Sequence, residues 1–205
     1  MDLMEKSAKE RILISATEEF VLNGYSGTSI KDISCNANVT TSLIFHHFKS
    51  KSCLWNSVKE SLLESLELSK LSMLEDIKYD NFDYFIETLL KEWLYGLFKN
   101  SDLVRFLKWQ MLEHRKIDSV NNEELESLFF FSNKPNGWRQ FIEVLKKFQC
   151  LGNIKENVDC VSIARIIIGG IHAGFHNPLY ALNSITKLDE YRKFLVHTIK
   201  YSVVI

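Results

Sequence analysis

Hydrophobic residues recur at helical spacing along most of the chain, and the first such stretch follows a clear start signal. Ser7 and Glu10 have the spacing of a capping box, in which each side chain bonds the other's backbone amide. Gly24 suits the left-handed position that ends many helices. The pattern therefore predicts a first helix with one apolar stripe, formed by Ile12, Leu13, Ala16 and Phe20.

Residues 28–51 predict two short helices and the start of a third. Thr28 or Ser29 can cap a helix whose Ile33 faces inward, and Asp32 takes the capping-box position after Ser29. The residues 36–38, Asn-Ala-Asn, then interrupt the pattern, because asparagine tolerates the left-handed conformation of a tight turn. Thr40 follows as a second helix cap.

The helix predicted over residues 41–47 has two unlike faces. Ile44 and Phe48 lie four residues apart and point to the interior. The opposite face presents small polar groups and an aromatic ring, and burial alone explains such a face poorly. It fits the second helix of a helix-turn-helix, which must enter a groove about 12 Å wide and place side chains against base edges. The outward residues are Thr41, Ser42, Phe45 and His46.

The remaining chain predicts further helices after a long connecting one. Leucine and valine at four-residue spacing predict a fourth helix from residue 50 to about 77, and residues 79–81 form the most plausible boundary turn. Additional helices are predicted over residues 82–99, 102–115, 121–131, 138–151 and 160–182. A final helix follows, for which Thr186 with Asp189 is the predicted cap.

Composition supports an all-α fold. The chain has 205 residues, of which 46% are hydrophobic, and only two prolines and eight glycines for the tight turns that a many-stranded fold needs. The formal net charge of -1 argues against a nucleic-acid binder, but residues 28–59 contain four lysines and only one acidic residue. A solvated surface explains this local excess about as well as a phosphate-binding surface does.

The four cysteines, Cys35, Cys53, Cys150 and Cys160, form no C-x-x-C pair and no metal-ligand spacing. They predict reduced and mostly buried thiols in a cytoplasmic protein, although a redox-sensing role for Cys150 or Cys160 stays open. Residues 1–10 are polar and charged, which is unlike a leader peptide, and no segment qualifies as a membrane span. We therefore expect no membrane partner, and no residue pattern implies a cofactor.

The order and spacing of many residues in the first sixty positions resemble the N-terminal signature of TetR-family transcriptional regulators. The resemblance implies an all-α fold in which an N-terminal three-helix helix-turn-helix domain, residues 1–50, is joined by a long helix to a helical effector-binding and dimerisation domain, residues 51–205. The residues that carry the resemblance are Arg11, Ile12, Leu13, Ala16, Phe20, Gly24, Tyr25, Thr28, Ser29, Ile33, Ala37, Val39, Leu43, Ile44, Phe45, His47, Phe48, Ser50 and Lys51.

The resemblance and the outward face together give a predicted DNA site. Base contacts are predicted for Thr41, Ser42 and Phe45, and phosphate contacts for Thr28, Lys31, Thr40, His46, His47 and Lys51. Three positions depart from the family pattern. Asn38 and Ser42 stand where the family usually has glycine, and Leu43 stands where a small hydroxyl residue often contacts phosphate.

Two further sites are predicted in the second domain, where the family usually holds a small molecule and forms a dimer. The predicted effector pocket contains Trp93, Phe106, Trp109, Trp138, His172 and His176, although core packing is the alternative for most aromatic residues. The predicted dimer interface contains Gly169, Gly170, Gly174, Tyr191, Leu195 and Ile199, with packing inside one chain as the alternative. His172 and His176 have the spacing of a metal pair, but position 173 is alanine and we predict no metal.

These patterns predict a homodimeric, sequence-specific regulator of transcription that binds double-stranded DNA, and specifically a repressor released by a small-molecule effector. The alternative is a helical module that binds small molecules or proteins and whose DNA contacts have decayed. An enzyme is not expected, because no nucleophile and base, paired carboxylates or phosphate-binding glycine loop emerge from the spacing.

Overall fold

The structure, a computed structural model, describes residues 6–64, 81–113, 137–176 and 184–204, without the His176 side chain. Its regular elements in these ranges are all α-helices, which confirms the predicted all-α class. The chain divides into two compact units. Unit 1 comprises Met1–Ser65 and Ser101–Leu128, and unit 2 comprises Leu66–Asn100 and Phe129–Ile205.

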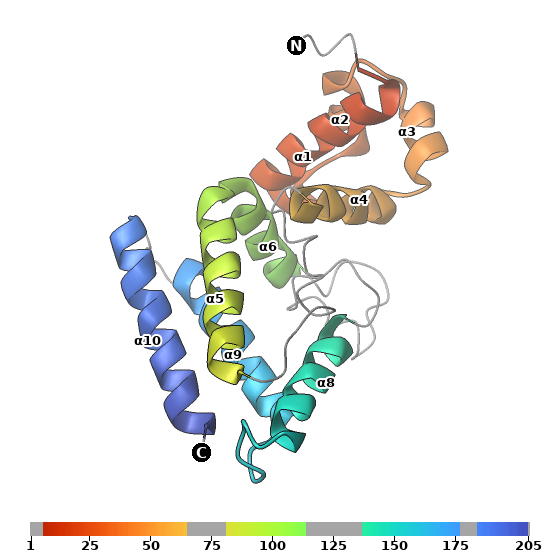
Figure 1. Cartoon of the computed structure of the whole chain (residues 1–205). Helices are drawn as coiled ribbons and strands as arrows, with labels where there is room; N and C mark the ends of the chain where they lie inside the picture. The colour runs from red at the N-terminus through yellow and green to blue at the C-terminus, as the bar shows by residue number, and fades with distance from the viewer. Residues whose placement is uncertain (1–5, 65–80, 114–136, 177–183, 205) are drawn as a thin grey trace. The chain divides into compact units, whose positions relative to one another are not determined.

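Unit 1 contains helices from two separate parts of the chain. Four of them follow one another, namely α1 (Ala8–Gly27), α2 (Ile30–Asn36), α3 (Thr41–Phe48) and α4 (Lys51–Glu64). A further described helix of this unit is α6 (Ser101–Glu113), which packs on both α1 and α4. Figure 1 shows α2 and α3 beside the first helix, α1, which contacts α2, α3, α4 and α6.

The first helix begins and turns where the local sequence predicts. Ser7 and Glu10 form the predicted capping box, with each side chain bonded to the other's backbone amide. Gly24 has a φ of 72° and kinks the helix near its end. Of the predicted stripe, Ile12, Ala16 and Phe20 are fully buried and Leu13 is only partly buried. This helix forms the centre of unit 1.

Aromatic rings fill the space between α1, α4 and α6. The Trp55 ring on α4 lies 5.0 Å from the Phe20 ring in an edge-to-face arrangement and 4.1 Å from the Phe106 ring in a stacked one. All three side chains are almost completely buried. Such ring pairs add about 0.5–1.5 kcal/mol beyond their area burial, so α6 is an integral part of this core.

Polar side chains of α6 also bond the backbone at the end of α1. Trp109 Nε1 donates to the carbonyl of Val21 at 3.2 Å, and Arg105 Nη2 donates to the carbonyl of Leu22 at 3.4 Å. The Glu113 carboxylate accepts from the Ser26 amide at 3.0 Å. These contacts complement the last turn of α1, where the kink leaves backbone groups without helical partners.

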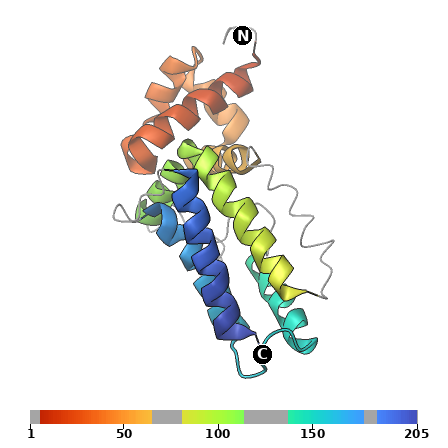
Figure 2. The same ribbon diagram turned by 60° about the vertical axis from the view of Figure 1, so that its left-hand side comes forward.

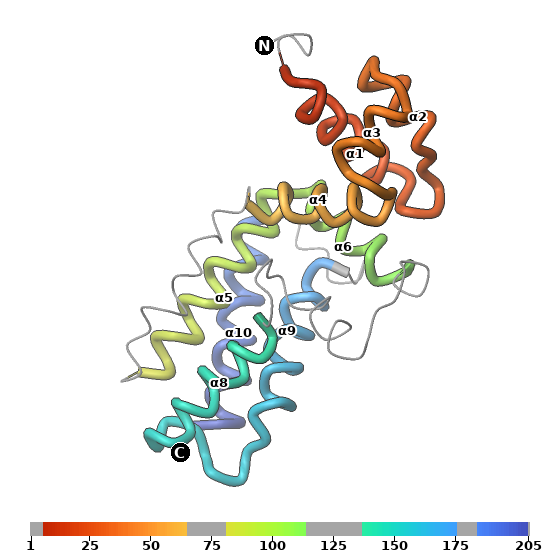
Figure 3. Tube along the Cα trace, turned by 90° about the vertical axis from the view of Figure 1, so that its right-hand side faces the viewer, coloured from red at the N-terminus to blue at the C-terminus, as the bar shows by residue number. Residues whose placement is uncertain are grey.

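Unit 2 contains α5 (Phe82–Lys99), α8 (Gly137–Cys150), α9 (Cys160–His176) and α10 (Ile185–Val203). Figures 1 and 2 both show α10 running beside α5, and the two helices are in extensive contact. In Figure 3, α8 lies alongside α9, which it also contacts. Among the described residues, no helix has both the length and the apolar composition required to span a membrane.

The core of unit 2 is largely apolar. The Phe148 ring on α8 lies 5.3 Å from the Phe82 ring and 5.1 Å from the Phe85 ring, both on α5. Helices α9 and α10 approach closely at Gly170, where a Cβ atom would come within 2.9 Å of Leu195. The Tyr191 hydroxyl donates to the Gly170 carbonyl at 2.6 Å, which fixes the same crossing.

Two local predictions are wrong. The cap of the last helix is Ser184, whose hydroxyl accepts from the Lys187 amide, and not Thr186. Asp189 instead bonds Arg192 and Lys193 on its own helix.

The prediction that the cysteines are mostly buried is also wrong. Three of the four are exposed and one is buried. The exposed cysteines are Cys35, Cys53 and Cys150, and the buried one is Cys160.

Several predicted elements lie outside the described residues. They include the continuation of the fourth helix to residue 77, the boundary turn at 79–81 apart from Asn81, the helix predicted over residues 121–131, and the ends predicted for two others. Within the described ranges, Asn81 caps α5 by accepting from the Tyr84 amide. The predicted helix over residues 82–99 is confirmed with the same bounds.

Candidate nucleic-acid interface

The turn between α2 and α3 has the geometry that the Asn-Ala-Asn sequence predicts. Asn38 has a φ of 50°, in the left-handed region. The amides of the turn remain bonded to the end of α2, with the Ala37 amide 2.9 Å from the Ile33 carbonyl and the Val39 amide 3.0 Å from the Ser34 carbonyl. Asparagine thus supplies here the conformation for which glycine is the usual residue.

Each short helix has the predicted cap. The Ser29 hydroxyl accepts from the Asp32 amide at 3.1 Å at the start of α2. The Thr40 hydroxyl accepts from the Leu43 amide at 3.3 Å at the start of α3. These caps begin both helices at defined residues, which matters because helices this short are not stable by themselves.

Side chains of α1 hold the turn in place from behind. Arg11 Nε donates to the Ala37 carbonyl at 3.1 Å, and its Nη1 donates to the Lys6 carbonyl at 3.0 Å. The Glu19 carboxylate accepts from the Asn36 side-chain amide at 2.8 Å. No role in the site was predicted for Arg11 or Glu19 from the sequence. Arg11 is one of the residues that carry the family resemblance, but neither its contact with the turn nor that of Glu19 follows from the local pattern.

The two faces of α3 are as predicted. Ile44 and Phe48 are buried in unit 1, whereas Thr41, Ser42, His46 and His47 are exposed. The Phe45 side chain is 47% exposed, which is high for an aromatic ring beside a well-packed core. The arrangement offers hydroxyl groups and one apolar ring on a helix held rigidly from its other side. Such groups can bond base edges and contact thymine methyl groups.

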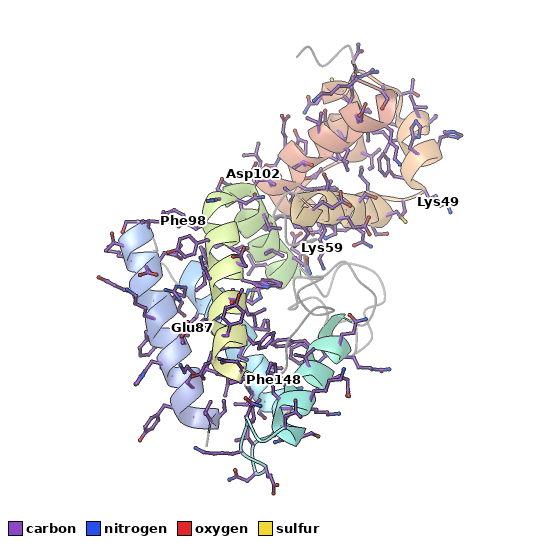
Figure 4. All side chains as sticks on the ribbon, viewed as in Figure 1. Lys49, Lys59, Glu87, Phe98, Asp102 and Phe148 are labelled. Atoms are coloured by element: carbon purple, nitrogen blue, oxygen red, sulfur yellow. The ribbon has the colours of Figure 1, made fainter. Side chains whose placement is uncertain are left out.

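Cationic groups follow α3 directly. Lys49 has a φ of 60° and is exposed at the end of α3, where Figure 4 labels it. Ser50 immediately precedes α4, and its hydroxyl accepts from the Cys53 amide at 3.1 Å. Helix starts and exposed lysines are both suitable partners for a phosphate.

The predicted phosphate-contact residues do not all face outward. Lys31, Thr40, His46 and His47 are exposed. Thr28 is only 3% exposed, and its hydroxyl lies 2.7 Å from the Gly24 carbonyl and 3.0 Å from the Glu19 carbonyl. The Thr28 side chain therefore serves the kinked end of α1 inside unit 1.

Two of the lysines are in unusual surroundings. The Lys51 ammonium lies 4.5 Å from the centre of the Tyr25 ring, and burial lowers its pKa, while the Glu113 carboxylate acts in the opposite direction. Burial lowers the pKa of Lys59 on α4 further, to about 8, against a smaller opposing effect of Glu60. The local positive charge counted in the sequence is thus less available to a ligand than the number of lysines indicates.

The six predicted effector-pocket residues are divided between the two units. Phe106 and Trp109 belong to unit 1, where the first stacks on Trp55 and the second bonds α1. Trp93, Trp138 and His172 are buried in unit 2, and the His176 side chain lies outside the described part. Within the described ranges, no three His, Cys, Asp or Glu side chains come together as a metal site would require.

The predicted dimer-interface residues also differ in their surroundings. Leu195 and Ile199 are buried within unit 2, and Gly174 is buried as well. Gly170 and Tyr191 bond each other across the α9–α10 crossing. Gly169 is exposed, and a Cβ atom there would meet nothing within 4 Å.

Comparisons with known proteins agree with the geometry of the first unit. Residues 12–58 match the family model described as bacterial regulatory proteins, tetR family. A protein of Escherichia coli strain K12 named as probable acrEF/envCD operon repressor is 23% identical over 170 residues, which cover 81% of this chain and 73% of that protein. The HTH-type transcriptional repressor DhaR of Mycobacterium strain GP1 is 29% identical over 68 residues, which cover 33% of this chain and 34% of that protein.

Solved structures extend the likeness to nearly the whole chain. NalD of Pseudomonas aeruginosa, described as the secondary repressor of the MexAB-OprM multidrug efflux pump, superposes with a TM-score of 0.67 at 20% identity, covering 96% of this chain and 95% of that one. A TerR/AcrR-family transcriptional regulator of Aquifex aeolicus gives a TM-score of 0.63 at 23% identity, covering 96% of this chain and 99% of that one. At these identities the likeness shows a shared fold.

Proposed function

We propose that this chain, a TetR-family transcriptional regulator by its N-terminal match and its helical fold, is a homodimeric repressor that a small-molecule effector releases from DNA. The relatives named as repressors support the direction of regulation. The observation that carries the proposal is α3, whose buried side fixes it to the unit while Thr41, Ser42 and Phe45 remain exposed and can reach bases. The protein would act in the cytoplasm, together with the double-stranded DNA that it binds.

The residues in and around α3 would make two kinds of DNA contact. Thr41, Ser42 and Phe45 would contact base edges in the major groove, and Lys31, Thr40, His46, His47 and Lys51 would contact phosphates. Thr28 would support these contacts from inside, because its side chain is buried. Two such units in a dimer would meet successive major grooves about 34 Å apart, or a multiple of that distance.

DNA binding can be tested with fragments selected from the source genome and an anisotropy assay over a range of salt concentrations. Steep weakening with salt is expected, with a slope of about -0.9 for each phosphate contacted. Replacing Thr41 and Phe45 together by alanine should reduce discrimination against mismatched sites by about 1–3 kcal/mol for each base that is no longer read. Tight binding that ignores both changes would contradict the proposal, and selection of no fragment would favour a module whose DNA contacts have decayed.

Dimerisation is proposed through exposed faces of α9 and α10. Four large hydrophobic side chains are more than half exposed there, namely Ile166 on α9 and Ile185, Phe194 and Tyr201 on α10. On α9, Gly169 and Ala173 continue the exposed face of Ile166 at helical spacing, which would let a partner helix approach closely. Of the predicted interface residues, Gly169 is the one that fits this surface best, because Leu195 and Ile199 are buried within the unit.

The dimer can be tested by sedimentation with a matched pair of variants. Phe194→Glu places a charge on the proposed interface, where it should shift the protein to monomer. Tyr84→Glu alters another exposed aromatic residue, on α5, and should leave the mass unchanged. Equal sedimentation of both variants and the natural chain would show that the Phe194 face of α10 is not part of the dimer interface.

The effector site is proposed for unit 2, where Trp93, Trp138 and His172 combine large apolar surfaces with polar ring atoms. The effector's binding energy would favour one separation of the two DNA-binding units over another. Native mass spectrometry of the purified protein should detect a bound small molecule. Its removal should change the affinity for DNA, and an unchanged affinity would contradict the release mechanism.

A further inference from the structure

Two charged side chains of α1 are bonded to adjacent residues at the end of α2, just before the turn that leads to α3. Arg11 Nε donates to the Ala37 carbonyl at 3.1 Å, and the Glu19 carboxylate accepts from the Asn36 side-chain amide at 2.8 Å. Arg11 and Glu19 are eight residues apart, which corresponds to about 12 Å along a helix. Bonds from two well-separated points of α1 to neighbouring residues restrain both the place and the rotation of the end of α2.

Each of the two charged side chains is itself held by a second bond. Arg11 Nη1 donates to the Lys6 carbonyl at 3.0 Å, and the other oxygen of Glu19 accepts from the Asn23 side-chain amide at 2.9 Å. A side chain with two partners keeps one geometry, as the supporting groups of a precise binding site must. Both side chains are therefore preorganised to hold the end of α2.

Apolar packing does not supply the same restraint. Helix α3 is attached to unit 1 by the buried side chains of Ile44 and Phe48. Contacts of this kind are non-directional, so they fix how deeply the helix lies more than how it is rotated. The turn before α3 is short, and Asn38 within it has a φ of 50°. A displacement of Asn36 and Ala37 is therefore passed on to α3 within a few residues.

We propose that Arg11 and Glu19 are positioning residues that determine how well α3 discriminates between DNA sequences, although neither is among the proposed DNA contacts. Base contacts depend on the angle at which a recognition helix lies in the major groove, whereas flexible lysine side chains can follow a phosphate when that angle changes. Loss of either bond should thus reduce sequence discrimination and preserve sequence-independent binding. This role rests on the proposed function, since it assumes that α3 reads bases.

A matched pair of asparagine substitutions separates the bond to α2 from the bond within α1. Asn36 and Asn23 both donate to the Glu19 carboxylate, and both are exposed. Affinities are measured for the fragment selected from the source genome and for a scrambled duplex of the same length and composition. Asn36→Ala should lower the ratio of the two affinities about tenfold, the effect of one lost base contact, and Asn23→Ala should change it less than about twofold.

Arg11 is tested against a neighbouring charge on the same helix. Arg11→Met keeps an aliphatic stem but removes both bonds of the guanidinium, and Lys9→Met removes an equal charge from an exposed residue of α1. Arg11→Met should lower the affinity ratio at least as much as Asn36→Ala, whereas Lys9→Met should leave the ratio unchanged. The salt dependence of binding to the scrambled duplex should be the same for both methionine variants, because neither loses a proposed phosphate contact.

A double substitution and a measurement without DNA test the same bond independently. Glu19→Ala already removes the bond to Asn36, so adding Asn36→Ala to it should cause no further loss of discrimination. The Val39 amide bonds the Ser34 carbonyl in the turn. Hydrogen exchange of this amide should be several-fold faster in Asn36→Ala than in Asn23→Ala, because the turn opens more often when it is less restrained.

The outcomes separate this role from the proposed function. If the natural chain binds both duplexes equally, α3 reads no sequence and the proposed function is wrong. If the natural chain discriminates but Asn36→Ala and Asn23→Ala both retain its affinity ratio, the positioning role is wrong. An equal loss of affinity for both duplexes in Asn36→Ala would also overturn it, because such a loss indicates unfolding or a lost phosphate contact. Arg11→Met decides in the same way should Asn36→Ala fail to fold.

Discussion

Unit 1 and unit 2 both combine ring packing with side-chain hydrogen bonds, but they differ in the balance of these contacts where their helices meet. In unit 1, side chains bond backbone groups of distant segments, as Arg11 does at the Ala37 carbonyl and Trp109 at the Val21 carbonyl. In unit 2, the described contacts include a cluster of phenylalanine rings between α5 and α8 and the close α9–α10 crossing at Gly170, where the Tyr191 hydroxyl supplies one directional bond. Directional bonds fix orientation, whereas apolar contacts are non-directional.

This difference matches what the proposed function requires of each part. A helix that enters a DNA groove must present its side chains at a defined angle, so fixed backbone positions around α2 and α3 are useful. A unit that holds an effector must change its packing when the effector binds. The two units are therefore expected to respond differently to similar substitutions, and four predictions test this, beginning with the largest effect.

The strongest test compares glycines that have the same conformation in the two units. Gly24 has a φ of 72° and a tryptophan ring 2.8 Å from the position of a Cβ atom, whereas Gly152 has a φ of 77° and open space. Gly24→Ala should destabilise the protein by about 2–4 kcal/mol, from the unfavourable backbone and the displaced ring. Gly152→Ala should cost about 1–2 kcal/mol, from the backbone alone. Equal costs in urea denaturation would show that Trp109 does not constrain α1.

The second test uses the partly buried Lys59 in unit 1. Burial lowers the pKa of Lys59 from its ordinary value of 10.5 to about 8. Below pH 8 Lys59 is protonated in both states, but its ammonium is partly removed from water only in the folded state. Between about pH 8 and 10.5 the unfolded chain binds more protons, and stability should therefore rise with pH in that range. Lys59→Met should stabilise the protein at pH 7, on the order of 1–3 kcal/mol, and remove this rise.

Unit 2 offers the opposite case as a control. Asp83 raises the pKa of Lys200 through a hydrogen bond, with the ammonium 2.6 Å from the carboxylate. That contribution is present below the ordinary pKa of lysine and is lost as pH rises through the raised value. Lys200→Met should therefore lower stability at pH 7 slightly, because the pair is partly exposed. A stabilising effect of both methionine substitutions would contradict the contrast.

The third test deletes one hydroxyl group from each unit. Thr28→Val removes the donor that serves the Gly24 and Glu19 carbonyls, and should cost about 1–2 kcal/mol. Tyr191→Phe removes the donor to the Gly170 carbonyl and should cost about 0.5–1.5 kcal/mol. Only the first change should also weaken DNA binding, since it alone alters the end of α1. Weaker DNA binding after Tyr191→Phe would mean that unit 2 constrains the DNA-facing helices.

The smallest effect is expected at Gly169, in the middle of α9. A methyl group there would meet nothing within 4 Å, so Gly169→Ala should stabilise the helix by up to about 1 kcal/mol. If α9 approaches a partner helix at this residue, the same change should weaken dimerisation. Stability measured by urea denaturation and mass measured by sedimentation would then move in opposite directions. A dimer of unchanged strength would place the interface elsewhere.

Much of the candidate site could be predicted because its signals are local. The caps at Ser7, Ser29 and Thr40 and the left-handed turn at Asn38 each involve residues within four positions of one another, where geometry follows directly from residue type. The inward positions of Ile44 and Phe48 followed from helical spacing in the same way. Where several polar residues stood near a helix start, as at Ser184 and Thr186, the pattern alone chose wrongly.

Within the described residues, the sequence by itself therefore determined where most helices lie, which of their faces are buried and the outward groups of α3, because each depends on neighbours in the chain. Only the tertiary structure decided which helix covers which face. It placed Phe106 and Trp109 of α6 against Trp55 and the end of α1, although an effector pocket was predicted for them. Apolar periodicity shows that a face is buried but carries no information about its partner. Residues 87 positions apart, such as Ser26 and Glu113, are brought together only by folding.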